Sequence, residues 1–118
     1  MKLKFRLPQY KKGKWRQSIF KAAKKAQREG GIQYRPEDKL IINVKLYLDK
    51  NAVLFHDLDN RLKDIMDSLQ GRFGGPKRNK TAKPVIPNDN QIYAVSIEKT
   101  RPYGQSKNRG HILIKKIR

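Results

Sequence analysis

The alternation of apolar and polar residues along the chain predicts four β-strands. Residues 2–7 alternate basic side chains with Leu3, Phe5 and Leu7, which predicts a strand that ends at Pro8. Residues 39–49 carry the strongest pattern, with an apolar side chain at every second position from Leu40 to Leu48. Shorter patterns of the same kind predict strands over 91–99 and 111–117.

Two further segments have the spacing of amphipathic helices. From Trp15 to Glu29 the apolar residues fall on one helical face, Gly30-Gly31 follows, and Trp15 is expected in the core. From about Asn60 to Gln70 apolar residues recur at i, i+3, i+4 and i+7. These elements predict a single α+β domain over residues 1–118, with a small mixed β-sheet and two main helices.

Charge and cysteine content narrow the class of protein. The 118 residues include 29 Lys and Arg against 10 Asp and Glu, and the formal net charge is +19. A charge this large predicts strong, salt-sensitive association with phosphate polymers. The absence of cysteine excludes disulfides and thiolate zinc sites and fits a cytoplasmic location. No apolar run approaches the roughly 18 residues of a membrane span, and the N-terminus lacks the apolar core of a signal peptide, so we expect no membrane association.

Acidic residues are concentrated in one short segment of this basic chain. Four of the ten lie between positions 57 and 67: Asp57, Asp59, Asp64 and Asp67. If the chain is extended before the second helix, Asp57 and Asp59 point to one side, and Asp59 is placed to cap the helix. Asp59, Lys63 and Asp67 share a helix face through i, i+4 and i+8 spacing. A patch of Asp57, Asp59, Asn60, Lys63 and Asp67 is therefore expected.

Asp89 stands apart from this group, directly before the strand predicted at 91–99. We expect that strand to return Asp89 to the acidic patch. Clustered carboxylates are ligands that Mg²⁺ prefers, and bound Mg²⁺ supports phosphodiester cleavage. The competing interpretation needs no metal, because Asp59 would be a helix cap, Asp59 and Lys63 an exposed ion pair, and Asp64 and Asp67 a solvated face.

The motif around these residues resembles RusA-type Holliday junction resolvases. The matching residues are Asp57-Leu58-Asp59-Asn60-x-x-Lys63, then Asp67-x-Leu69, then Asn88-Asp89-x-Gln91-Ile92, so they cover about residues 57–92. The resemblance implies an intertwined homodimer that uses Mg²⁺, or Mn²⁺ as a substitute, to cut four-way DNA junctions by paired symmetrical nicks in DNA recombination and repair. It implies that Asp57, Asp59 and Asp89 are the catalytic and metal-binding carboxylates, that Lys63 is the essential lysine, and that Asn60 and Asp67 support them.

The chain departs from that pattern at three places. Asn88 stands where the family has the first aspartate of a pair, the segment between Asp67 and Asp89 is longer than usual, and the N-terminal segment 7–12 differs. Two alternatives therefore remain open. One is a basic nucleic-acid-binding protein without catalysis, and the other is a nuclease for flaps or other branched DNA.

Basic residues outside the motif are candidates for DNA contact. A flexible basic loop is expected over 72–88, with Gly74-Gly75-Pro76 and no acid before Asp89. Phe73 is a candidate for stacking on unpaired bases. His56 is expected to pack or lie at the surface rather than act as a general base. The predicted DNA-binding residues are Lys11, Lys12, Lys14, Arg16, Arg72, Phe73, Lys77, Arg78, Lys80 and Lys83.

Overall fold

Two helices and a four-stranded sheet make up the described part of the chain. The structure is a computed structural model that describes residues 2–49, 56–72, 83–101 and 109–117. In chain order its elements are β1 (Lys2–Leu7), α1 (Trp15–Gly30), β2 (Leu40–Tyr47), α3 (Leu58–Leu69), the short 3₁₀ helix η2 (Asp89–Gln91), β3 (Ile92–Thr100) and β4 (Arg109–Lys116). The predicted α+β fold with a small mixed sheet is confirmed.

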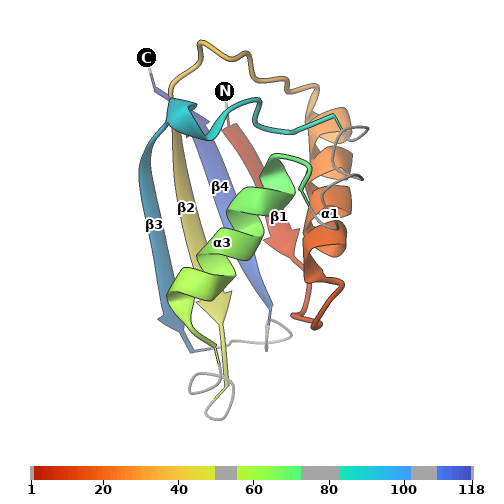
Figure 1. Cartoon of the computed structure of the whole chain (residues 1–118), viewed down its shortest axis with the longest axis vertical. Helices are drawn as coiled ribbons and strands as arrows, with labels where there is room; N and C mark the ends of the chain where they lie inside the picture. Colours follow the sequence, from red (N-terminus) through yellow and green to blue (C-terminus); the bar gives the residue numbers. More distant parts are fainter. Residues whose placement is uncertain (1, 50–55, 73–82, 102–108, 118) are drawn as a thin grey trace.

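The strands lie in the order β1-β4-β2-β3 (Figure 1). β4 pairs antiparallel with both β1 and β2, whereas β2 and β3 are parallel. Parallel neighbours cannot be joined by a tight turn, so the chain must cross back over the sheet between them. α3 lies in this crossover, which makes β2, α3 and β3 a βαβ unit.

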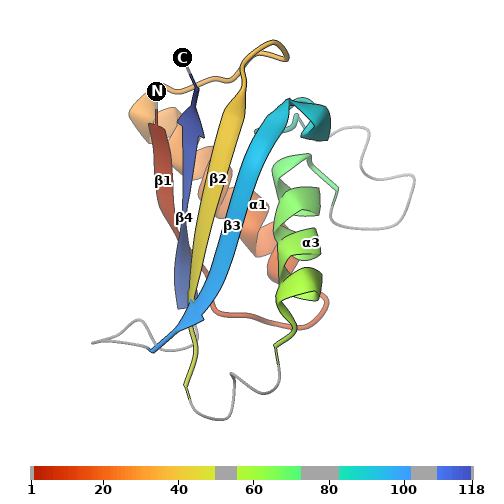
Figure 2. The same ribbon diagram turned by 90° about the vertical axis from the view of Figure 1, so that its left-hand side faces the viewer.

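Both helices cover the same face of the sheet (Figure 2). The strand residues under them are apolar and buried, because alternate side chains of a strand point to one face. Their neighbours on the other face include the alternating basic residues of β1, which are exposed. The strand side chains of the core are Leu3, Phe5, Leu7, Leu40, Ile42, Val44, Leu46, Ile112 and Ile114.

α1 follows the predicted helix closely. Trp15, Ile19 and Ala23, spaced i, i+4 and i+8, are its buried residues. The Trp15 indole donates a hydrogen bond to the Pro8 carbonyl at 2.8 Å, so the loop after β1 is tied to the start of the helix. The helix stops at Gly31, whose φ of 62° is a conformation that glycine adopts without steric cost.

The described residues 83–88 after α3 form no helix or strand. Two of them, Val85 and Ile86, are buried in the core, whereas Lys83 and Asn88 at the two ends are exposed. The backbone N–H groups of both residues donate to the Leu69 carbonyl, at 2.8 and 3.0 Å. This part of the predicted loop is therefore anchored on the core by Val85 and Ile86, because burial of apolar side chains is favourable; residues 73–82 of the predicted loop lie outside the described residues. Within the described residues, no helix is long and apolar enough to cross a membrane.

Candidate functional site

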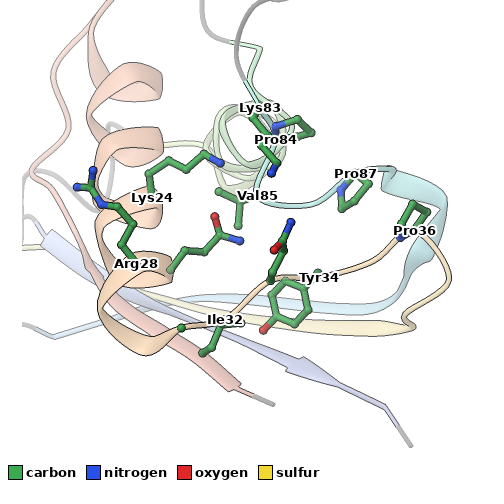
Figure 3. A pocket seen from close by; sticks show the side chains of 12 residues that line it. Lys24, Arg28, Ile32, Tyr34, Pro36, Lys83, Pro84, Val85 and Pro87 are labelled. Carbon is green, nitrogen blue, oxygen red and sulfur yellow. The ribbon is translucent and has the colours of Figure 1, made fainter.

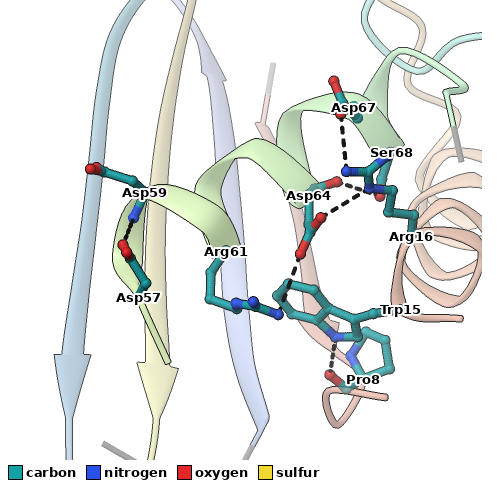
Figure 4. A network of polar contacts seen from close by, with 9 residues as sticks. All are labelled: Pro8, Trp15, Arg16, Asp57, Asp59, Arg61, Asp64, Asp67 and Ser68. Carbon is teal, nitrogen blue, oxygen red and sulfur yellow. Dashed lines mark hydrogen bonds and ion pairs between the residues drawn. The ribbon is translucent and has the colours of Figure 1, made fainter. Parts of the chain in front are cut away.

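Asp57 and Asp59 lie at the N-terminus of α3 (Figure 4). Asp57 is extended and caps the helix, and its carboxylate accepts the Asp59 N–H at 2.9 Å. The cap predicted for Asp59 was wrong, because the helix starts at Leu58 and leaves Asp59 in its first turn. Both carboxylates are exposed, at the end of the sheet where β2 and β3 finish.

Two more of the predicted members of the patch lie on exposed parts of α3 near these residues. Asn60 and Lys63 are both exposed. The Asp59–Lys63 ion pair that the competing interpretation expected is not among those formed by the described residues. The Lys63 ammonium, one helical turn beyond Asp59, is thus not held by that carboxylate.

Asp64 and Asp67 are held by arginines (Figure 4). The Arg16 guanidinium from α1 lies 2.9 Å from the Asp64 carboxylate and 3.5 Å from that of Asp67. Arg61 approaches the second Asp64 oxygen at 3.4 Å. These contacts tie α1 to α3. Asp67 therefore has an ion-pair partner at the helix–helix contact, and Arg16, expected to bind DNA, has two carboxylate partners within its own chain.

Arg61 lies in an aromatic cage that the sequence did not reveal. Its side chain is only 12% exposed and lies over the Tyr10 ring, 4.0 Å from the centroid. The Trp15 ring is 5.9 Å away, and the His56 ring packs edge-on against Tyr10. Within the described residues the buried Arg61 Nε has no hydrogen-bond partner, so the aromatic faces stabilise the guanidinium through cation–π attraction. In the sequence, the i, i+3 spacing of Arg61 and Asp64 was the feature that could have indicated an ion pair between these two residues.

His56 is a buried packing residue, as expected. Burial lowers its pKa below the ordinary value, and the positive charges of Arg61 and Lys99 lower the pKa further. It is therefore neutral at physiological pH and does not carry a charge into the acidic patch.

Asp89 is the first residue of η2, and η2 lies at the opposite end of the sheet from the N-terminus of α3, which bears Asp57 and Asp59 (Figure 1). β2 and β3 are parallel, so the residues before β3 lie where β2 begins. α3 starts at the other end, beside the last residues of those strands. The expected convergence of Asp89 on the acidic patch does not occur within one chain, because α3 and the segment after it carry the chain back across the sheet.

The residues around Asp89 have a structural role. The Asn88 side chain caps η2, and the Gln91 side chain accepts the Asn88 N–H at 2.8 Å. Gln91 is 4% exposed, and its amide donates to the carbonyls of Arg35 and Asp38, both at 2.8 Å. This part of the motif therefore anchors the start of β3 to the turn before β2, while Asp89 itself is exposed.

The described residues contain no group of three or more His, Cys, Asp or Glu side chains placed to hold one metal ion. Asp57 and Asp59 are two residues apart and both face solvent. Mg²⁺ in proteins is commonly held by one or two carboxylates, with waters and substrate phosphates completing its octahedral shell. The chemistry of this pair fits such a partial site.

The predicted DNA-binding residues divide into three groups. Lys11, Lys12 and Lys14 are exposed between β1 and α1, and Arg72 and Lys83 are exposed after α3. Arg16 is engaged in ion pairs. The remaining candidates, Phe73, Lys77, Arg78 and Lys80, lie outside the described residues.

No protein-family model matches this chain, and no curated protein matches it. The resemblance to RusA-type resolvases therefore remains a prediction from the motif.

Proposed function

We propose that the protein is a Mg²⁺-dependent endonuclease for branched DNA, with four-way junctions as the leading substrate. One observation carries the proposal. Asp57, Asp59 and Asp89 are exposed and take part in none of the ion pairs of the described residues, whereas Asp64 and Asp67 beside them are held by arginines. In a chain of net charge +19, carboxylates that no cation of the described residues holds are available to bind a metal ion.

Asp57 and Asp59 would hold Mg²⁺, together with water and a substrate phosphate. When bound, the ion supplies polarisation of the phosphate and a bound water of lowered pKa. Asp57 keeps one carboxylate oxygen beyond the one that caps α3. The N-terminus of α3 favours the approach of a phosphate, because its free N–H groups carry partial positive charge. The Lys63 ammonium, exposed one turn along, would neutralise a phosphate oxygen as charge develops.

Asp89 requires a second chain if it is to join this site. A two-fold dimer that sets the η2 end of one subunit against the α3 N-terminus of the other would form two identical sites, each with Asp57 and Asp59 of one chain and Asp89 of its partner. Two such sites match the two-fold symmetry of a four-way junction. Paired nicks would then follow from the symmetry of the assembly.

The first experiment is cleavage of a labelled synthetic four-way junction, with and without Mg²⁺, beside a flap substrate and a linear duplex. We expect paired, metal-dependent nicks that disappear in Asp59→Asn and in Asp89→Asn. Lys21→Gln, an exposed substitution on α1, is the matched control and should keep full activity. Persistence of cleavage in Asp59→Asn, or binding of the junction without a cut in Mg²⁺ or Mn²⁺, would contradict the proposal.

A mixed dimer tests whether the site is shared. Asp59→Asn and Asp89→Asn chains with different affinity tags are co-expressed, and the heterodimer is isolated through both tags. If Asp89 acts across the dimer, one of the two sites is intact and the heterodimer nicks one strand. If both residues act within one chain, both sites are lost and the heterodimer is inactive. If the Asp89→Asn homodimer still cleaves the junction, Asp89 is not part of the catalytic site.

A second candidate function is nucleic-acid binding without catalysis. The separation of Asp89 from the other two carboxylates favours it, because the described residues of one chain then form no three-carboxylate metal site. It predicts tight junction binding, no metal-dependent cut, and unchanged binding when Asp57, Asp59 or Asp89 becomes Asn. The cleavage assay with these variants distinguishes the two functions.

A further inference from the structure

A pocket of about 530 Å³ lies at the C-terminal end of α1 (Figure 3). The N-terminus of α3, which bears Asp57 and Asp59, lies toward the other end of the sheet (Figure 1). The volume of the pocket is within the range of small-molecule sites in proteins. Its walls come from three separate stretches of chain: the last turns of α1, the segment 31–36 before β2, and the segment 83–87 before η2. Because Val85 and Ile86 anchor the third stretch on Leu69, that wall is held in place by the core.

One part of the pocket lining is apolar. Tyr34 and Val85 belong to the buried core beneath the pocket, and the partly buried Ile32 packs against that core. Pro36, Pro84 and Pro87 complete this part, and proline rings restrict the backbone around them. A preformed apolar surface of this kind accepts the flat face of a nucleobase at little cost in ordering.

The lining also contains the cations Lys24, Arg28 and Lys83, and none of the described residues that line the pocket is acidic. Lys24 extends from α1 toward the segment that bears Lys83 (Figure 3). Burial lowers the pKa of Lys24 below its ordinary value, and the positive charge of Lys83 lowers the pKa further. Two ammonium groups that repel each other in this way are both stabilised when a phosphate binds between them.

Two glutamines add neutral hydrogen-bonding groups. Gln27 and Gln33 line the pocket from α1 and from the segment before β2. A glutamine amide offers both donors and acceptors, which suits the edge of a base or a sugar hydroxyl. Cations, amides and an apolar wall together match the parts of a nucleotide, whereas inorganic phosphate would leave the apolar wall unused.

We infer that this pocket binds one unpaired nucleotide of a DNA strand, with its phosphate between Lys24 and Lys83 and its base against the half-buried apolar side chains of Ile32, Pro84 and Pro87. The inference deepens the proposed function and rests on its DNA-binding part alone. Branched DNA presents unpaired nucleotides where strands exchange, so a pocket of this kind gives the protein a preference for branch points over continuous duplex.

The test is a binding measurement in EDTA, so that absence of cleavage has no effect on it. Fluorescence anisotropy at fixed salt gives the affinity for a single-stranded oligonucleotide and for a blunt duplex. Both affinities are measured for the unmodified protein and for the double variant Lys24→Gln/Lys83→Gln. We expect about tenfold weaker binding of the single strand, the loss expected for charge-assisted contacts to one phosphate, and a smaller change for the duplex. Lys24→Arg/Lys83→Arg should keep most of the affinity.

The matched control is Lys21→Gln/Lys25→Gln, which removes the same charge from exposed positions of α1 outside the pocket. We expect less than about a twofold effect from this pair, because only the general electrostatic attraction changes. Equal losses in the two double variants, or equal losses for single strand and duplex, would overturn the inference. Binding of thymidine monophosphate in the pocket that leaves the affinity for the single strand unchanged would also overturn the inference, since the pocket would then serve free nucleotides.

Discussion

Replacing Gln91 by alanine separates the structural part of the Asn88–Gln91 motif from its predicted chemistry. The buried Gln91 amide donates to two backbone carbonyls and accepts one backbone N–H, so it joins η2 to the turn before β2. Alanine removes all three hydrogen bonds and leaves buried groups without a partner. The start of β3 would then lose its anchor to the neighbouring parallel strand.

The magnitude follows from the three contacts. A net contribution of about 1 kcal/mol for each hydrogen bond gives a loss of about 3 kcal/mol in the free energy of unfolding. Domains of this size are stable by about 5–15 kcal/mol, so the loss is a large fraction of the total. It corresponds to a fall in the melting temperature on the order of 10 °C.

The assay is urea unfolding followed by the fluorescence of Trp15, the single tryptophan, which is buried in the core. Protein concentration and ionic strength are held constant, because association and charge both change apparent stability. Asn90→Ala, an exposed substitution in the same 3₁₀ turn, is the matched control and should change stability by less than about 0.5 kcal/mol. A loss below about 1 kcal/mol in Gln91→Ala would refute the reasoning.

Two other predictions concern the helices and the cage. Arg16→Gln removes the ion pairs to Asp64 and Asp67, and because these groups are partly solvated we expect a loss of only about 1 kcal/mol by the same urea assay. A drop in DNA affinity as large as that of the exposed Lys14→Gln, without loss of stability, would contradict the structural role of Arg16. The lowered pKa of His56 means that the unfolded chain takes up its proton first, so stability should fall as pH drops below about 6.5. His56→Asn should reduce the fall of the urea midpoint as the pH drops below about 6.5, and an unchanged dependence on pH would refute this cause. The dependence that remains is assigned to His111, whose pKa is also lowered by burial.

The secondary structure was largely predictable because its signals are local. The predicted strands and helices correspond to the observed elements within a few residues at each end. In β1 the alternation of basic and apolar side chains is the alternation of exposed and buried positions. The burial of Val85 and Ile86 was not predicted, because two apolar residues after a basic, glycine-rich stretch have no helical or alternating spacing.

The candidate site was predictable only in part. Asp57 and Asp59 are neighbours in sequence, so their proximity at the start of α3 required no knowledge of the fold. The position of Asp89 depended on the direction of β3. A strand antiparallel to β2 and starting near the α3 N-terminus would have brought Asp89 to the patch, whereas the parallel pairing placed it at the far end.

The amino-acid sequence alone determined the α+β class, the buried stripe of each helix, the basic surface and the pair of carboxylates at the α3 N-terminus. These properties depend on composition and on spacings of a few residues. The tertiary structure alone decided which carboxylates are held by Arg16 and Arg61, where Asp89 lies, and that Lys24 and Lys83 face one pocket. Each of these depends on contacts between segments distant in sequence, which form only when helices and strands pack on a common core.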